Sequence, residues 1–100
     1  MVRHIVCWKL KDHAEGRTKQ ENALLLQKSL MEMKDMISQI REIEVGIDIA
    51  EVETNWDLVL NSTFDNAADL DIYQKHPAHQ EFKELVMKLR DLRACVDYEF

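Results

Sequence analysis

The chain has very little glycine and proline. Its 100 residues include only two glycines, Gly16 and Gly46, and a single proline, Pro77. Loops that cradle nucleotide phosphates are rich in glycine, because the backbone must approach the phosphate closely. Two isolated glycines therefore argue against nucleotide-dependent chemistry. No stretch rich in Pro, Gly or Ser separates one part of the chain from another, and no internal repeat is present, so we expect a single domain over residues 1–100.

Excess positive charge and long apolar runs are also missing. Thirteen Lys and Arg stand against 19 Asp and Glu, which gives a net charge of -6 without any basic stripe. Nucleic acids and anionic membranes select clustered Lys and Arg, so neither is an expected partner. The segment 1–10 is too short and too interrupted for a signal peptide or a membrane span. We expect a cytoplasmic protein with a modest core, to which oligomerisation could add stability.

Cysteine is scarce. Cys7 and Cys95 have neither the CxxC spacing of a redox motif nor the spacing of a metal finger, which favours reduced thiols over a disulfide. Both cysteines fall in strand-like segments. They could be neighbours on adjacent strands, and the sequence leaves that open.

Four segments alternate between apolar and polar residues, as strands do. Residues 2–10 carry their richer apolar face on the even positions, which turns His4 toward the core. Residues 43–49 and 56–64 alternate in the same way and are predicted to form a hairpin. The last segment, 95–100, returns to this alternation.

Three segments carry apolar residues at helical spacing. A capping box predicts a long helix over residues 18–36. A short helix follows the hairpin and ends near residue 75, because the residue before a proline is biased out of the helical region. Pro77 then opens a third helix that ends near residue 90, so His76 is expected at a junction between two helices.

This order, strand–helix–strand–strand–helix–helix–strand, predicts an α+β fold. It suits a ferredoxin-like antiparallel sheet with its helices on one face. The second face of the sheet is then uncovered, and its mixed polarity is suitable for packing against a second copy of the chain, so we predict a homodimer. The residues that we assign to the uncovered face are Arg3, Ile5, Cys7, Asp57, Val59, Asn61, Thr63, Asp97 and Glu99.

The segment 73–79 gathers a phenol and two imidazoles around the only proline. Tyr73 falls on the inward side of the short helix and His79 at the border of the next apolar stripe, so both could reach the space toward which His4 points. A base held by a hydrogen bond from a second group is what enolisation beside a carbonyl requires. The simpler interpretation, that Tyr73 and His79 are semi-buried packing residues, stays open.

The sequence gives less support to a chemical role for His76 or to a metal site built from histidines. His76 is explained more simply as a helix cap. A metal site built from His4, His76 and His79 lacks an HExxH pattern and a carboxylate at a compelling ligand position, so we predict none.

Several stretches together resemble the stress-responsive dimeric α/β barrel (Dabb) family, over nearly the whole chain. They are the initial Val-Arg-His-Ile-Val, the strand that ends in Ser-Thr-Phe, the His-Pro-Ala-His after an aromatic helix, and the closing Val-Asp-Tyr. The resemblance implies that two ferredoxin-like protomers pair sheet to sheet into a dimeric α/β barrel. The wider group includes cofactor-independent monooxygenases. A plant polyketide cyclase of the family uses a His as the base of an aldol closure together with a Tyr, and these roles match His79 and Tyr73, while a cavity-lining strand histidine matches His4.

We therefore expect a small, mostly apolar or carbonyl ligand to bind between sheet and helices, without a cofactor. One alternative is a cofactor-free enzyme of the cyclase, lyase or monooxygenase kind, in which His79 is the base and Tyr73 orients it or the substrate. Another alternative is a structural dimer that binds no ligand. The expected pocket walls are His4, Trp8, Phe64 and Phe82.

Overall fold

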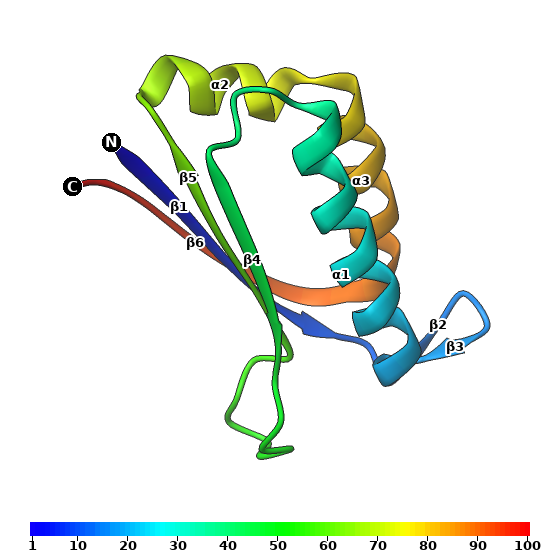
Figure 1. Ribbon diagram of the computed structural model, residues 1–100. Helices are drawn as coiled ribbons and strands as arrows, with labels where there is room; N and C mark the ends of the chain where they lie inside the picture. Colours follow the sequence, from blue (N-terminus) through cyan, green and yellow to red (C-terminus); the bar gives the residue numbers. More distant parts are fainter.

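The computed structural model describes residues Met1–Phe100 and has two layers, a four-stranded antiparallel sheet and three helices on one of its faces (Figure 1). The strands β1 (Val2–Leu10), β4 (Glu42–Ile47), β5 (Leu58–Phe64) and β6 (Arg90–Glu99) lie in the order β4-β5-β1-β6. The helices are α1 (Lys19–Met36), α2 (Ala67–Lys75) and α3 (Pro77–Leu89). This is the predicted ferredoxin-like α+β fold. None of the helices is long and apolar enough to cross a membrane.

Strand β1 lies inside the sheet, between β5 and β6. Its even residues are buried under the helices and its odd residues are only half-buried, as the alternation predicted. His4 is accordingly on the helix side and is 2% exposed. The core between sheet and helices contains 19 buried apolar residues, which places the histidine in a largely dry environment.

The ends of the helices follow the predicted signals. The amide of Glu21 donates to Thr18 Oγ1 at 3.2 Å, and the amide of Thr18 donates to the Glu21 carboxylate at 3.0 Å, so the capping box is formed. His76 ends α2 and also caps α3, where its Nδ1 accepts a hydrogen bond from the amide of Ala78 at 3.0 Å. The predicted junction role of His76 is confirmed.

A small hairpin precedes α1 and was not predicted. Its strands are β2 (His13–Ala14) and β3 (Arg17–Thr18), joined by Glu15 and Gly16. Both joining residues have positive φ, 53° and 77°, as a two-residue turn of this kind requires. Strands of two residues are too short for alternation to appear in the sequence.

The uncovered face of the sheet differs from the prediction in its edge strand. Asp97 pairs with His4 and Glu99 with Val2, so both acidic residues lie on the helix side, and their assignment to the open face was wrong. Asp57 also turns away from that face, because its carboxylate accepts a hydrogen bond from the amide of Leu10 at 2.8 Å.

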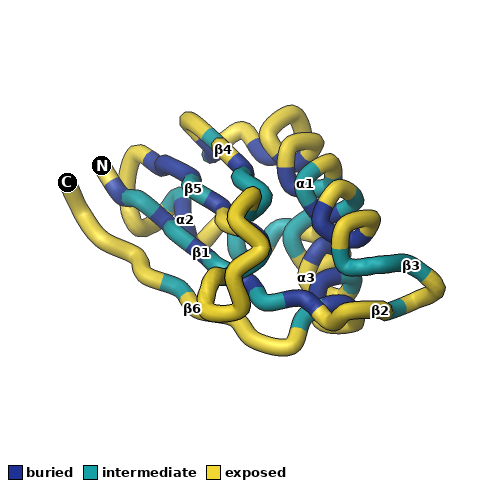
Figure 2. The backbone as a smooth tube through the Cα atoms, turned by 90° about the horizontal axis from the view of Figure 1, so that it is seen from below, coloured by how far each residue is buried: buried dark blue, intermediate teal, exposed yellow.

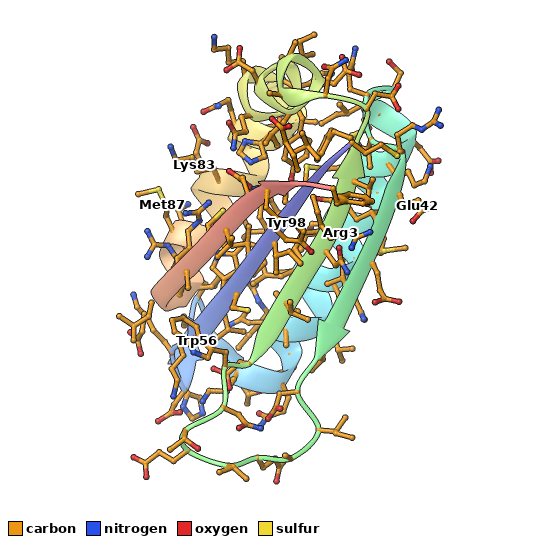
Figure 3. The ribbon with its side chains drawn as sticks, turned by 90° about the vertical axis from the view of Figure 1, so that its left-hand side faces the viewer. Arg3, Glu42, Trp56, Lys83, Met87 and Tyr98 are labelled. Carbon is orange, nitrogen blue, oxygen red and sulfur yellow. The ribbon has the colours of Figure 1, made fainter.

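The open face is therefore more apolar than expected. In β6 the residues that share it with Ile5 are Leu92, Val96 and Tyr98, which are 54%, 62% and 42% exposed. Figure 2 shows that most of β6 is exposed, and Figure 3 shows Tyr98 and Arg3 on this face. A single chain leaves this apolar surface in water.

The two cysteines are free and lie on opposite faces of the sheet. Cys7 pairs with Ala94 on the open side, whereas Cys95 pairs with Val6 on the helix side. The strands are neighbours but the thiols are not, so the two residues do not form a disulfide within the chain.

Candidate functional site

A cavity of about 390 Å³ lies between the sheet and helices α2 and α3. Its floor is formed by buried residues of β1 and β5, and its exposed residues lie on α3 and β6, so the cavity opens beside that edge of the sheet. Figure 3 shows two of these residues, Lys83 and Met87, on α3 beyond the edge of the sheet that β6 forms. The lining consists of His4, Val6, Trp8, Leu60, Tyr73, Gln74, His79, Gln80, Phe82, Lys83, Val86, Met87, Arg90 and Arg93.

Three elements bring His4, Tyr73 and His79 together at this cavity. The ring centroid of Tyr73 is 4.7 Å from that of His79 and 5.9 Å from that of His4, both in edge-to-face geometry. Strand β1 supplies His4 through its even positions, while the break at Pro77 sets the directions of α2 and α3, which carry the other two rings. A phenol between two imidazoles is an arrangement that can pass a proton.

The predicted aromatic walls divide into two groups. Trp8 and Phe82 line the cavity and contact each other edge to face, with ring centroids 5.9 Å apart. Phe64 is fully buried and lies 5.0 Å from the ring of Tyr73, but it is not part of the cavity wall. Phe64 packs against Tyr73 outside the cavity, so Phe64 is not placed to contact a ligand there.

Asp97 holds the ring of His4, a contact that the sequence analysis missed. The carboxylate of Asp97 accepts a hydrogen bond from Nδ1 of His4 across the β1–β6 pair. Because an ionised carboxylate can only accept, Nδ1 carries the proton, and Nε2 of a neutral His4 is left as an acceptor. Histidine paired with carboxylate in this way is oriented for receiving a proton. Asp97 in the strand opposite His4 was the available signal, but it depends on the register.

Burial controls the protonation of the other two groups. It lowers the pKa of His79 to about 4, with a further contribution from the nearby His4, so the imidazole is neutral near pH 7. Burial also raises the pKa of Tyr73 well above its usual value, so the phenol keeps its proton. Near pH 7 the protonated phenol of Tyr73 can therefore donate a hydrogen bond, and the neutral imidazole of His79 can accept one.

Two buried polar atoms at the cavity have no hydrogen-bond partner in the protein. They are Nε1 of Trp8 and Nδ1 of His79. Trp8 is 3% exposed, and an indole N–H can only donate. Leaving a buried polar group unpaired costs about 1–3 kcal/mol, which a partner that enters the cavity could recover.

The only group of side chains that could gather around a metal is His4, Cys95 and Asp97, whose ligand atoms lie within 4.8 Å of one another. Metal binding needs the thiolate of a cysteine. Burial, reinforced by the charge of Asp97, instead raises the pKa of Cys95 and favours its thiol. His76, which the sequence analysis considered as a ligand, is occupied as a helix cap.

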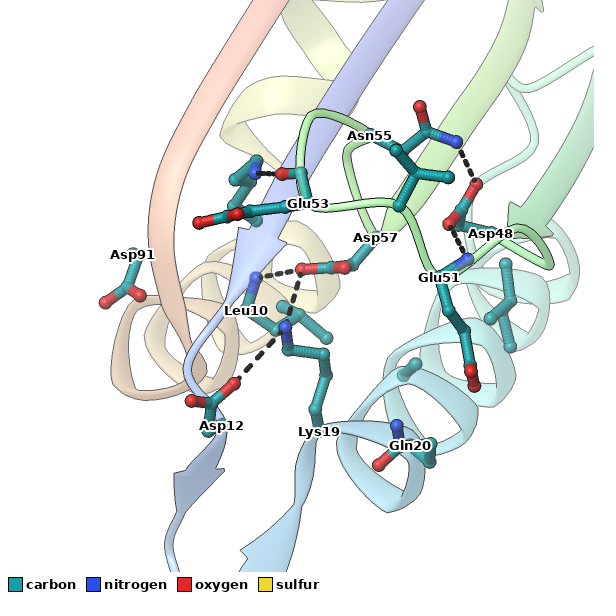
Figure 4. A pocket seen from close by; sticks show the side chains of 14 residues that line it. Leu10, Asp12, Lys19, Gln20, Asp48, Glu51, Glu53, Asn55, Asp57 and Asp91 are labelled. Atoms are coloured by element: carbon teal, nitrogen blue, oxygen red, sulfur yellow. Dashed lines mark hydrogen bonds and ion pairs between the residues drawn. The ribbon is translucent and has the colours of Figure 1, made fainter.

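A second cavity, of about 450 Å³, lies at the other end of the sheet under the loop between β4 and β5 (Figure 4). Here Asp57 joins the elements: its carboxylate contacts the amide of Leu10 at 2.8 Å and Nζ of Lys19 at 3.7 Å. Asp48 holds the loop through Asn55 and the amide of Glu51. These polar groups form hydrogen bonds and ion pairs with one another, so their role in this cavity is to hold the loop and the neighbouring elements together.

Comparison with known proteins identifies the family. The model of the stress responsive A/B barrel domain matches residues 2–100. An uncharacterized protein of Streptomyces coelicolor is 31% identical over the full length of both chains. A dimeric protein of unknown function from Bacteroides fragilis, with a ferredoxin-like fold, is 35% identical with a TM-score of 0.87, covering 99% of this chain and 95% of that one.

A dimeric ferredoxin-like protein of unknown function from Thermobifida fusca has the same fold at 18% identity, with a TM-score of 0.84 over 99% of this chain and 90% of the other. The family match extends over the sheet, the helices and the residues around the cavity. The chain belongs to the stress responsive A/B barrel (Dabb) family.

Proposed function

We propose that the cavity between sheet and helices binds a small molecule with a mostly apolar body and an oxygen-bearing polar group. The observation that carries this proposal is the pair of unpartnered atoms, Nε1 of Trp8 and Nδ1 of His79, in the wall of a cavity whose 14 lining residues include seven hydrophobic ones. A carbonyl or hydroxyl oxygen would accept from the indole N–H. The cavity is of the size that small ligands occupy.

A second candidate function is cofactor-free proton transfer in the same cavity. It is supported by the 4.7 Å separation of the Tyr73 and His79 rings and by the carboxylate that orients His4. A pKa of about 4 makes His79 a weak base toward carbon acids. We therefore favour His4 for accepting a proton, with Tyr73 donating a hydrogen bond to the substrate oxygen and His79 as a second hydrogen-bond partner of the substrate.

We further propose that this chain also forms a dimer, as several relatives are described to do, and that two copies pair through the open face of the sheet. The exposed Leu92, Val96 and Tyr98 support this, because water contact with such a patch is unfavourable. The cavity lies on the opposite side of the sheet from this interface. Two free cysteines are also compatible with the reducing cytoplasm.

Native mass spectrometry of the purified protein tests the binding proposal, with Trp8→Phe compared with Trp56→Phe. Trp8→Phe keeps an aromatic wall but removes the unpaired N–H, whereas Trp56 lies outside this cavity. We expect wild type and Trp56→Phe to retain the same small molecule, and Trp8→Phe to lose most of it.

The purely structural alternative makes a different prediction. If no molecule is retained by any of these proteins, no reaction is detected, and His79→Ala lowers the free energy of unfolding by more than about 2 kcal/mol, the cavity residues serve packing alone.

A further inference from the structure

The opening of the ligand cavity is positively charged. Lys83 on α3 and Arg90 and Arg93 on β6 line it, and no Asp or Glu does. This is unusual in a chain with 19 acidic and 13 basic residues. The second cavity has the opposite character, since its lining contains six carboxylates and two lysines.

These three cations are not paired within the protein. The ion pairs of the chain involve His4, Lys19, Arg41 and Lys75, and none includes a cation of the cavity opening. Lys83 and Arg93 are exposed, and Arg90 is half-buried. The cations are thus free to hold an anion that comes from outside.

The cations are also directed toward the candidate site. Arg93 pairs with Trp8 in the β1–β6 register, so its side chain is on the helix side of the sheet. Lys83 lines the cavity and is four residues after His79 on α3, so the two side chains lie on the same side of the helix. The positive charges of both side chains lower the pKa of His79, after the larger effects of burial and His4, which agrees with this placement.

We propose that the ligand is an amphipathic organic acid, with its anionic head at the opening against Arg93, Arg90 and Lys83 and its apolar body against Trp8 and Phe82. A guanidinium can hold a carboxylate through two parallel hydrogen bonds, and Lys83 adds charge from the other side of the opening. This inference rests on the proposed binding function and specifies the class of ligand.

The test measures the affinity of matched acids and amides. Octanoate and octanamide, and 4-phenylbutanoate and 4-phenylbutanamide, differ within each pair only in the head group. The variant Trp56→Phe leaves Trp8 as the only tryptophan, so its fluorescence reports on the cavity wall, and calorimetry on the wild type provides a second measurement. The charge variants Arg93→Gln, Arg90→Gln and Lys83→Gln are compared with Lys88→Gln, which removes a charge from α3 outside the cavity.

We expect each acid to bind about tenfold more tightly than its amide, because hydrogen bonds to charged groups are stronger. Arg93→Gln should abolish most of this preference and Lys83→Gln should reduce it, whereas Lys88→Gln should leave it unchanged. The preference should also decrease as salt concentration rises.

Equal affinity for acids and amides would overturn the inference while leaving the binding proposal intact. A preference that survives in Arg93→Gln, Arg90→Gln and Lys83→Gln alike would also overturn it, because the head group would then lie elsewhere. If none of the four compounds binds to the folded wild type, both proposals fail.

Discussion

His4 and Asp97 are 93 positions apart in the sequence, yet they form a hydrogen-bonded pair across β1 and β6 on the helix side of the sheet. His4 is almost completely buried, whereas Asp97 is 41% exposed. The partly exposed carboxylate therefore orients a buried ring of the cavity wall, although Asp97 does not itself line the cavity. It also gives the N–H of a buried ring its partner.

Asp97→Ala tests this pair. The variant leaves the buried Nδ1 of His4 without its acceptor, which should cost about 1–3 kcal/mol in the free energy of unfolding. Asp97→Asn keeps an acceptor and should cost less. Urea denaturation of both variants, and of each combined with His4→Phe, measures the coupling. Additive effects of Asp97→Ala and His4→Phe would mean that the contact contributes nothing.

Acid should destabilise the protein through His79. Its pKa is about 4 in the folded chain and near 6.5 when unfolded, so the unfolded state binds more protons between these values. Stability should therefore fall as the pH is lowered from 6.5 toward 4, and this contribution should become constant below 4. The groups that face His79 are His4, Tyr73, Lys83 and Arg93.

His79→Gln removes the titrating group and should flatten this part of the stability profile, as measured by denaturant unfolding at a series of pH values. His13→Gln is a suitable comparison, because His13 is exposed on β2 and is outside the cavity. A profile that remains as steep in His79→Gln would assign the acid sensitivity to another group.

Two substitutions of Tyr73 distinguish its role in packing from a role in ligand binding. Its side chain is 1% exposed, but its hydroxyl makes no hydrogen bond within the protein, so Tyr73→Phe should change the free energy of unfolding by less than about 1 kcal/mol. Tyr73→Ala should cost about 3–5 kcal/mol, because it opens a cavity against Phe64. If Tyr73 serves a ligand, Tyr73→Phe should weaken retention of that ligand, as measured by native mass spectrometry, while stability is kept.

If the chain forms a dimer through the open face of the sheet, a charged side chain introduced there should prevent dimer formation. Val96→Glu places a carboxylate at the centre of this apolar surface and should convert the proposed dimer to monomer in sedimentation experiments. Leu24→Glu, at an exposed position of α1, should not change the assembly state. A dimer that persists in Val96→Glu would mean that the chains pair through another surface.

The fold was largely predictable from local signals. The Thr18 capping box and Pro77 set the helix boundaries, because caps and proline act over a few residues. The alternation of β1 gave the inward direction of His4, since a strand inside the sheet has one clearly buried face. These features depend only on neighbouring residues, so a single sequence contains them.

The site was less predictable, and the error was in β6. This edge strand alternates as regularly as β1, but both of its faces are largely exposed, so the pattern does not tell which face meets the helices. The register of β6 with β1 determines which face meets the helices: it places Asp97 on the helix side of the sheet and Val96 on the open face. The partner of His4 and the cations at the cavity opening were missed for the same reason, since they depend on long-range register.

The position of β1 between β5 and β6 has a consequence for how the protein forms. The hydrogen bonds along one edge of β1, the first strand, form only when β6, the last strand, pairs with it. The contacts between these two strands join residues that are most distant in sequence. Closing such long loops is slow. During synthesis the helices and β5 can assemble first, while one edge of β1 stays open until the ribosome releases β6. The opening that we propose for an organic acid needs Arg90 and Arg93 of that strand, so it is then the last part of the cavity to form.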